Sequence, residues 1–192
     1  ISQLTLEQAL YFYLSGYTAE FSSAKEGSKE QIRPVFSQGY AESCSLRPVE
    51  TYLSLFQKRL EETHSPVYLL NTGWQGGSHD QGGKRMDVRS VQKILTAILS
   101  LEGKIGREQS VLPIFNLAIP DVLSGVEGKM LDPRFSWASH AHYYAQLQRL
   151  AGVFLENSRQ YDLPLAVERA GPAVEGFASA VAAAQNNNKE DI

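Results

Sequence analysis

The chain has 192 residues, 43% of them hydrophobic and 20% charged, and a formal net charge of −3. It is long enough to bury one sizeable core, while its mild negative charge argues against a basic nucleic-acid surface and gives no reason to expect a membrane partner. No apolar run approaches the ~18 residues that a membrane-spanning helix needs. The single cysteine, Cys44, excludes an internal disulfide and fits a reducing compartment, so we expect a cytoplasmic protein. The chain opens on Ile1 rather than Met, which we interpret as a fragment, a processed product or a trimmed chain.

The first segment predicts a capped helix, a strand and a loop. Thr5 and Gln8 have the spacing of a capping box, and an apolar helical stripe follows them up to Gly16. Residues 17–21 then predict a strand, and the polar stretch 22–33 predicts a loop.

The middle of the chain predicts a helix, a buried strand and a second helix. Pro48 suits the first turn of a helix that we expect over residues 48–62. A strand is expected over residues 66–72, and the apolar positions of residues 88–100 recur at the spacing of one helix face.

The last third predicts one extended segment and the longest helix. Residues 111–119 read as extended and buried, residues 139–160 as the longest helix, and the alanine-rich residues 173–192 as a frayed helix with a disordered polar tail. Between them we expect a long loop that contains Gly125, Gly128 and Pro133. Helices that alternate with a few irregularly spaced strands favour an α+β fold, with a mixed sheet and packed helices.

The glycine-rich stretch 71–85 is the most informative part of the sequence. A glycine-rich loop that ends in two cations, between a strand and a helix, can bring backbone N–H groups up to phosphate. It nearly matches the phosphate-binding pattern G-x-x-x-x-G-K-[ST], but Ser78 stands at the first glycine and Arg85 at the last hydroxyl. From spacing alone, an anion-binding loop and a plain mobile loop both stay open.

Five segments resemble, in order, motifs of the ATP-dependent phosphoenolpyruvate carboxykinase family. The segments are LSGYTA (14–19), NTGW followed by glycines and GKR (71–85), LPIFNLAIP (112–120), LDPR (131–134) and AGP (170–172). The resemblance implies that residues 1–172 form much of the C-terminal, nucleotide-side lobe of a bilobal mixed fold, with residues 173–192 as an additional segment.

The reaction implied by the resemblance is the conversion of oxaloacetate and ATP into phosphoenolpyruvate, carbon dioxide and ADP, assisted by Mg²⁺ or Mn²⁺. The family's phosphate-binding loop, metal ligands and substrate arginines all precede the region seen here. We therefore expect no catalytic residue and no metal ligand in this chain, and no activity from it alone. An enzyme would need the N-terminal portion or a second chain as a partner.

Four residues carry over as candidates for binding adenine nucleotide. Lys84 and Arg85 match the family's GKR, and Met86 falls where an aliphatic residue lies against the base. Val91 replaces a nucleotide-binding threonine, and its side chain cannot make that hydrogen bond. The structural alternative is a solvated pair of cations at a helix entrance for Lys84 and Arg85, and a helix packing residue for Val91.

Departures from the family pattern leave two function classes open. Glu20 replaces a lysine, and Arg33 replaces an acidic residue before the proline. Together with Val91 these changes favour a non-catalytic carboxykinase-like protein, used for nucleotide sensing or as a protein-interaction scaffold, whereas NTGW and GKR favour the nucleotide-binding portion of an enzyme.

No other chemistry is indicated by the sequence. His140 and His142 are two positions apart, so on a helix they point to different faces and make a poor metal pair. No serine lies in a G-x-S-x-G setting, and we expect packing or surface roles for all four histidines, with His79 in the glycine-rich loop the most accessible to a ligand.

Overall fold

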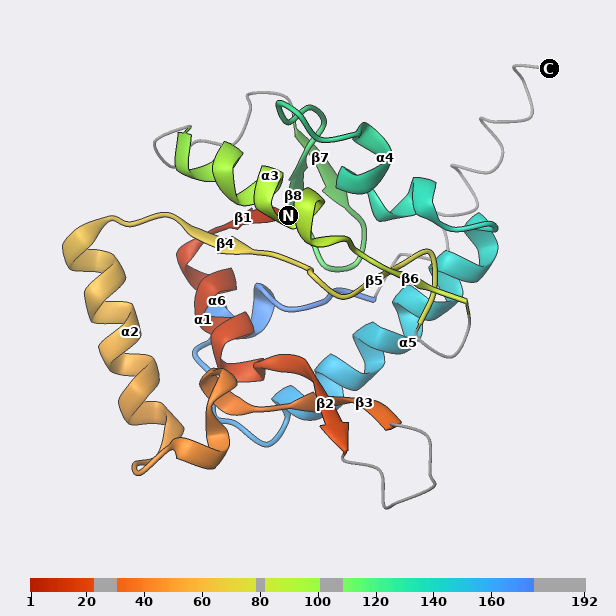
Figure 1. The fold of residues 1–192 in the computed structure, drawn as a ribbon. Coiled ribbons are helices and arrows are strands. Elements are labelled where there is room, and N and C mark those ends of the chain that lie inside the picture. The colour runs from red at the N-terminus through yellow and green to blue at the C-terminus, as the bar shows by residue number, and fades with distance from the viewer. Residues whose placement is uncertain (23–30, 79–81, 101–108, 175–192) are drawn as a thin grey trace.

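Helix α1 (Leu6–Ser15) lies at the centre of the structure, a computed structural model that describes residues 1–22, 31–78, 82–100 and 109–174 (Figure 1). The predicted capping box starts it: the Thr5 N–H donates to Gln8 Oε1 (3.1 Å), and the Gln8 N–H donates to Thr5 Oγ1 (3.2 Å). It ends at Gly16, whose φ of 52° favours glycine. A Cβ at this position would overlap the carbonyl oxygen of Ser37.

The strands of the described ranges form four two-stranded antiparallel pairs. The pairs are β1 (Ser2–Leu4) with β4 (Val67–Leu69), β2 (Tyr17–Ser22) with β3 (Gln31–Phe36), β5 (Trp74–Gln75) with β6 (Lys84–Arg85), and β7 (Gln109–Leu112) with β8 (Leu117–Pro120). The α+β prediction is confirmed, although these strands pair two by two instead of forming one mixed sheet.

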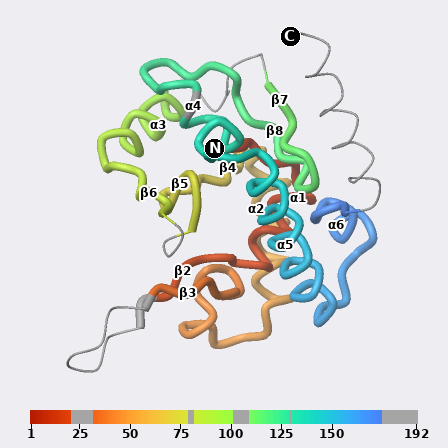
Figure 2. Tube along the Cα trace, turned by 90° about the vertical axis from the view of Figure 1, so that its right-hand side faces the viewer, coloured from red at the N-terminus to blue at the C-terminus, as the bar shows by residue number. Residues whose placement is uncertain are grey.

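The helices surround α1 on several sides. Figure 1 shows α2 and α5 on either side of α1, and both views place α3 and α4 at one end of the molecule and the β2–β3 hairpin at the other (Figure 2). The α-helices after α1 are α2 (Val49–Thr63), α3 (Val88–Ser100), α4 (Gly128–Leu131), α5 (His140–Ser158) and α6 (Leu165–Arg169), and the 3₁₀ helices are η1 (Gln38–Tyr40), η2 (Glu42–Cys44) and η3 (Pro133–Ser136). The predicted helices at 48–62, 88–100 and 139–160 are confirmed within about two residues, and α5 is the longest.

The prediction of one extended segment over residues 111–119 was wrong, because the chain reverses inside it. Ile114 and Asn116 have φ values of 68° and 50°, so the run divides into β7, a turn and β8. The turn is held by the Phe115 N–H, which donates to the Pro113 carbonyl (2.8 Å), and by the Ala173 N–H, which donates to the Ile114 carbonyl (2.8 Å). Burial of the Ile114 side chain offsets a backbone conformation that is unfavourable for a β-branched residue.

Three other expected loops contain regular structure. The predicted loop 22–33 overlaps β3, which starts at Gln31 and tolerates Pro34 because its hairpin has only two strands. The glycine-rich stretch 71–85 contains the β5–β6 pair, and the long loop after β8 contains α4 and η3. The strands β5 and β6 and the helices α4 and η3 have too few residues to produce a detectable hydrophobic period in the sequence.

Two groups of buried apolar side chains form the interior. The larger, which we call the aromatic core, consists of Leu10, Tyr11, Phe12, Ile114, Phe115, Leu117, Ala151, Phe154 and Val167. The smaller, which we call the cavity core, consists of Ile94, Ala97, Leu123 and Leu131.

The expected tail falls almost entirely at residues 175–192, outside the described residues, as does His79. Within the described ranges, no helix combines the length and the apolar character that crossing a membrane requires.

Candidate functional site

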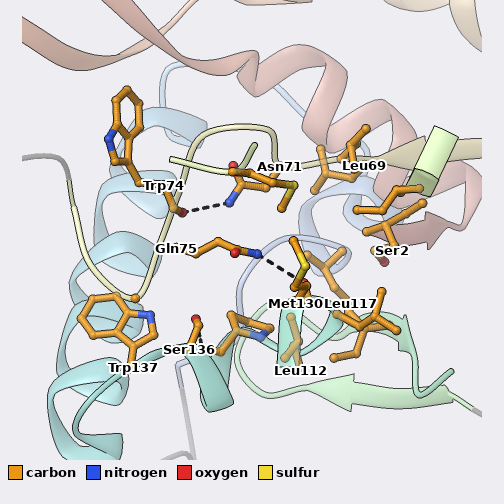
Figure 3. A pocket seen from close by; sticks show the side chains of 18 of the residues that line it. Ser2, Leu69, Asn71, Trp74, Gln75, Leu112, Leu117, Met130, Ser136 and Trp137 are labelled. Atoms are coloured by element: carbon orange, nitrogen blue, oxygen red, sulfur yellow. Dashed lines mark hydrogen bonds between the residues drawn. The ribbon is translucent and has the colours of Figure 1, made fainter. Parts of the chain in front are cut away.

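A cavity of about 190 Å³ borders the cavity core and opens beside the β5–β6 hairpin (Figure 3). Its apolar wall is contributed by strands, α3 and α4, through Leu70, Met86, Ile94, Leu117, Ile119 and Leu131. Its polar and aromatic lining includes Asn71, Trp74, Gln75, Ser136 and Trp137. Sites that enclose a drug-sized ligand measure ~300–1,000 Å³, so this cavity has room for one ring system and leaves the rest of a larger ligand outside.

The entrance to the hairpin is shaped by Asn71. Its side-chain oxygen accepts from the Gly73 N–H (2.8 Å), and its amide nitrogen donates to the Trp74 carbonyl (3.3 Å). The Met86 N–H donates to the Gly73 carbonyl (2.8 Å), which ties the end of β6 back to this turn. Asn71 thus shapes the loop, and the turn directs the Met86 side chain to the cavity wall.

Two glycines allow the hairpin to lie close to its neighbours. Gly76 has a φ of 74°, and a Cβ there would lie 2.5 Å from the carbonyl oxygen of Ser136 in η3. A Cβ on Gly83 would overlap the carbonyl oxygen of Gly77 across the hairpin. Glycine is therefore required at both positions for steric reasons.

The two cations at the end of the glycine-rich stretch belong to β6. Lys84 is paired with Gln75 and Arg85 with Trp74 across the hairpin, and both cations are exposed. The guanidinium carbon of Arg85 lies 5.8 Å from the centroid of the Trp74 ring, within the range of a cation–π contact. In a cation–π contact, the guanidinium N–H groups that point away from the ring remain able to meet an anion.

Helix α3 begins directly after these cations with an aspartate cap. Asp87 accepts from the Ser90 N–H (3.0 Å) and from the Ser90 hydroxyl (2.6 Å), and these hydrogen bonds lower the pKa of the Asp87 carboxyl. Val91 is half-buried on the first turns of α3 and does not line the cavity. Of the four candidates, Met86 lines the cavity and Arg85 contacts Trp74, which also lines it. Lys84 precedes Arg85 on the same strand, and Val91 is not part of the cavity lining.

The opposite side of the cavity comes from α4 and η3, which the sequence analysis did not assign to a site. The Gln75 amide nitrogen donates to the Met130 carbonyl (3.4 Å) across the cavity. The Trp137 ring meets the rings of His142 (5.3 Å between centroids) and Tyr143 (5.9 Å) edge-on. The signal that could have identified Trp137 is its position three residues after the LDPR motif.

A partly buried ion pair holds this second side. The Asp132 carboxylate accepts from Arg134 Nε (2.9 Å) and from its terminal nitrogen (2.6 Å), and it also accepts from the Arg134 N–H (2.9 Å), so that it caps η3. Burial, and then the nearby Asp132 charge, raise the pKa of Tyr143 to about 12. The hydrogen bonds between Asp132 and Arg134 fix the position of η3.

Comparison with known proteins identifies the family. The family model described as phosphoenolpyruvate carboxykinase matches residues 1–129. The chain is also similar to the phosphoenolpyruvate carboxykinase (ATP) of Candida glabrata, at 35% identity over 164 residues, which is 84% of this chain. The chain belongs to the phosphoenolpyruvate carboxykinase family. It spans 29% of the length of that relative.

Two departures from the carboxykinase pattern turn out to be partners in space. Glu20 and Arg33 are directly opposite each other in the β2–β3 hairpin. The Arg33 guanidinium donates to Glu20 Oε2 through Nε (2.9 Å) and a terminal nitrogen (2.6 Å). The side chains are exposed, and such a pair contributes about 0.2–1 kcal/mol.

The lining of the cavity fits part of the carboxykinase cofactor set. Apolar and indole surfaces with two nearby cations suit an adenine ring followed by phosphates. No group of three or more His, Cys, Asp or Glu side chains within the described ranges could hold a metal ion. The described residues therefore fit the nucleotide and do not fit its metal.

Proposed function

We propose that this chain is the nucleotide-binding portion of an ATP-dependent phosphoenolpyruvate carboxykinase, which converts oxaloacetate and ATP into phosphoenolpyruvate, carbon dioxide and ADP. The observation that carries the proposal is the cavity itself, where Met86 and Trp74 supply the wall and the Arg85 guanidinium makes a cation–π contact with Trp74. In this proposal the adenine ring lies against Met86, and the ribose and phosphates leave toward Lys84 and Arg85.

The chain would contribute binding and orientation to the reaction. Phosphoryl transfer depends on positioning and on neutralising charge at the transferring group, and a divalent metal (Mg²⁺ or Mn²⁺) supplies part of that neutralisation when bound. The phosphate-binding loop, metal ligands and substrate arginines would come from an N-terminal portion or from a second chain. We therefore propose that the 192-residue chain alone is inactive.

The expected affinity follows from the few contacts that this portion offers. Charge-assisted hydrogen bonds from Lys84 and Arg85 would contribute about 1.5–3 kcal/mol each where partly desolvated. Val91 lacks the hydroxyl of the family's threonine, which removes about one neutral hydrogen bond of 0.5–1.5 kcal/mol. Without the remaining phosphate contacts we expect binding no tighter than roughly millimolar, about −4 kcal/mol.

Calorimetric titration of the chain with ATP and magnesium tests the binding proposal. Arg85→Ala should weaken binding about tenfold or more, because it removes both the cation and the group stacked on Trp74. Arg149→Ala is the matched control, since Arg149 is an exposed cation on α5 that does not line the cavity. Micromolar binding that Arg85→Ala leaves unchanged would place the nucleotide elsewhere.

A non-catalytic, carboxykinase-like protein used for nucleotide sensing or as a scaffold is the second candidate, and Val91 is the observation that favours it. The departures Glu20 and Arg33 also favour it by their charges, although in this chain the two side chains pair with each other. A coupled assay for oxaloacetate-dependent ADP formation, on a polypeptide that includes the N-terminal portion, separates the candidates. Turnover that Arg85→Ala abolishes supports the enzyme, and binding of ATP without turnover supports the sensor.

A further inference from the structure

Most side-chain polar groups around the cavity are already used by the protein. Both polar atoms of the Asn71 side chain are bonded to its own turn, and the Ser136 hydroxyl donates to the Pro133 carbonyl (2.8 Å). The side chains that retain hydrogen-bonding capacity therefore determine which ring the cavity prefers.

Gln75 retains an acceptor. A backbone carbonyl can only accept, so the hydrogen bond to Met130 requires the amide nitrogen of Gln75 to face Met130. The amide orientation is then fixed, and no donor within the described ranges reaches Gln75 Oε1. Figure 3 shows this side chain extended across the cavity toward Met130.

Trp137 retains a donor. Its ring is held edge-on by His142 and Tyr143, with interplanar angles of 88° and 67°. Figure 3 shows the indole nitrogen on the side of the ring that faces Ser136 and the cavity. No acceptor for this N–H lies among the residues that the structure describes, and an indole N–H can only donate.

We infer that Gln75 and Trp137 together select adenine over guanine, an assignment that rests on the proposed binding of a purine nucleotide in this cavity. The 6-amino group of adenine donates to Gln75 Oε1, and its N1 accepts from the Trp137 N–H. Guanine has an oxygen at position 6 and a hydrogen on N1. The oxygen would face the acceptor Gln75 Oε1, and the N1 hydrogen would face the Trp137 N–H donor, so neither hydrogen bond could form. Turning the base over to correct the match would carry the ribose and phosphates away from Lys84 and Arg85.

The chain offers a direct readout, because it has two tryptophans and both line the cavity. A ¹H–¹⁵N spectrum of the full chain should contain two indole N–H signals, and Trp137→Phe assigns them by deleting one. Titration with ATP, GTP and ITP compares the bases, since ITP carries the guanine-like 6-oxygen and N1 hydrogen without the 2-amino group. ATP should bind about tenfold more tightly than either, and ATP alone should move the Trp137 indole proton downfield.

Variants separate the two contacts from general packing. Gln75→Leu and Trp137→Phe should each weaken ATP binding about threefold to tenfold, and bring the ATP:ITP affinity ratio toward one. Met86→Leu, which changes only the apolar wall, should alter the affinities for all three nucleotides alike. Trp137→Phe keeps the ring and its edge contacts, so it remains informative if Gln75→Leu disturbs folding.

The outcomes distinguish this inference from the proposed function. If ATP and ITP bind equally to the unchanged chain, or if either variant keeps the ATP preference while its melting temperature is unchanged, base selection by Gln75 and Trp137 is wrong while nucleotide binding stands. If ATP shifts neither indole signal, both this inference and the proposed function are overturned.

Discussion

The aromatic core and the cavity core are built in opposite ways. In the aromatic core, the Phe154 ring lies within 6.4 Å, centroid to centroid, of the rings of Tyr11, Phe12, Tyr17, Phe36 and Phe115. The cavity core consists of four aliphatic side chains, and two of them, Ile94 and Leu131, line the cavity.

The difference indicates a division of roles within one small fold. Closely packed rings contribute dispersion and burial energy at one end, whereas the region around the cavity forgoes some of that energy and keeps room for a ligand. The aromatic core should therefore dominate stability, and the hairpin beside the cavity core should dominate binding.

The largest expected effect is that of Phe154→Ala in the aromatic core. Phe154 is 3% exposed, and its removal should cost about 3–5 kcal/mol of unfolding free energy, measured by urea denaturation. Ile94→Ala in the cavity core should cost about 2–3 kcal/mol, because the wall there is already incomplete. If Ile94→Ala loses as much unfolding free energy as Phe154→Ala, or more, the aromatic core does not dominate stability.

A smaller effect on stability, but a large one on binding, is expected from Gly83→Ala. The added Cβ would displace the Gly77 carbonyl and open the β5–β6 hairpin, at a cost of about 1–3 kcal/mol. ATP affinity should fall by more than about tenfold, since the hairpin positions Arg85 and Met86. Gly152→Ala in α5 is the matched control: its Cβ would meet nothing within 4 Å, so stability should rise slightly and binding should stay unchanged.

Alkaline pH should weaken the side of the cavity formed by η3. The pKa of Tyr143 is raised from 10.0 to about 12, so the folded state keeps the phenol proton that the unfolded state has lost. This contribution to stability is complete below pH 10 and is lost as the pH rises toward 12. Unfolding free energies measured across this window should fall less steeply in Tyr143→Phe, and an unchanged slope would mean that Tyr143 ionises normally. Other tyrosines with raised pKa values, such as Tyr11 and Tyr17, leave a residual slope in the variant.

The smallest expected effect is at the exposed Glu20–Arg33 ion pair of the β2–β3 hairpin. Glu20→Lys and Arg33→Glu should each destabilise the hairpin by about 0.2–1 kcal/mol, and the double variant, in which the two charges are exchanged, should recover most of the loss. A double-mutant cycle by thermal denaturation measures the coupling. Additive losses would show that the two departures are independent.

Helices α1, α2, α3 and α5 could be predicted because their apolar residues repeat along the sequence, and the Thr5–Gln8 box needed only local chemistry. The β7–β8 hairpin could not, since its turn depends on positive φ values at Ile114 and Asn116, and such values are uncommon for isoleucine. Family resemblance identified Met86, which lines the cavity, and the neighbouring Lys84 and Arg85. The other side is joined to it by contacts such as Gln75 to Met130, which are 55 positions apart and leave no local pattern.

Photolabelling with 8-azido-ATP, followed by peptide mapping, reports where the base lies and so tests whether the nucleotide binds in this cavity. We expect the label to attach within residues 69–77, 86–94 or 130–137, and unlabelled ATP to compete with it. Arg85→Ala should reduce the labelling strongly, whereas Arg149→Ala should not. Labelling concentrated on α2 or on the β2–β3 hairpin, or labelling that ATP fails to displace, would contradict the placement of the nucleotide in this cavity.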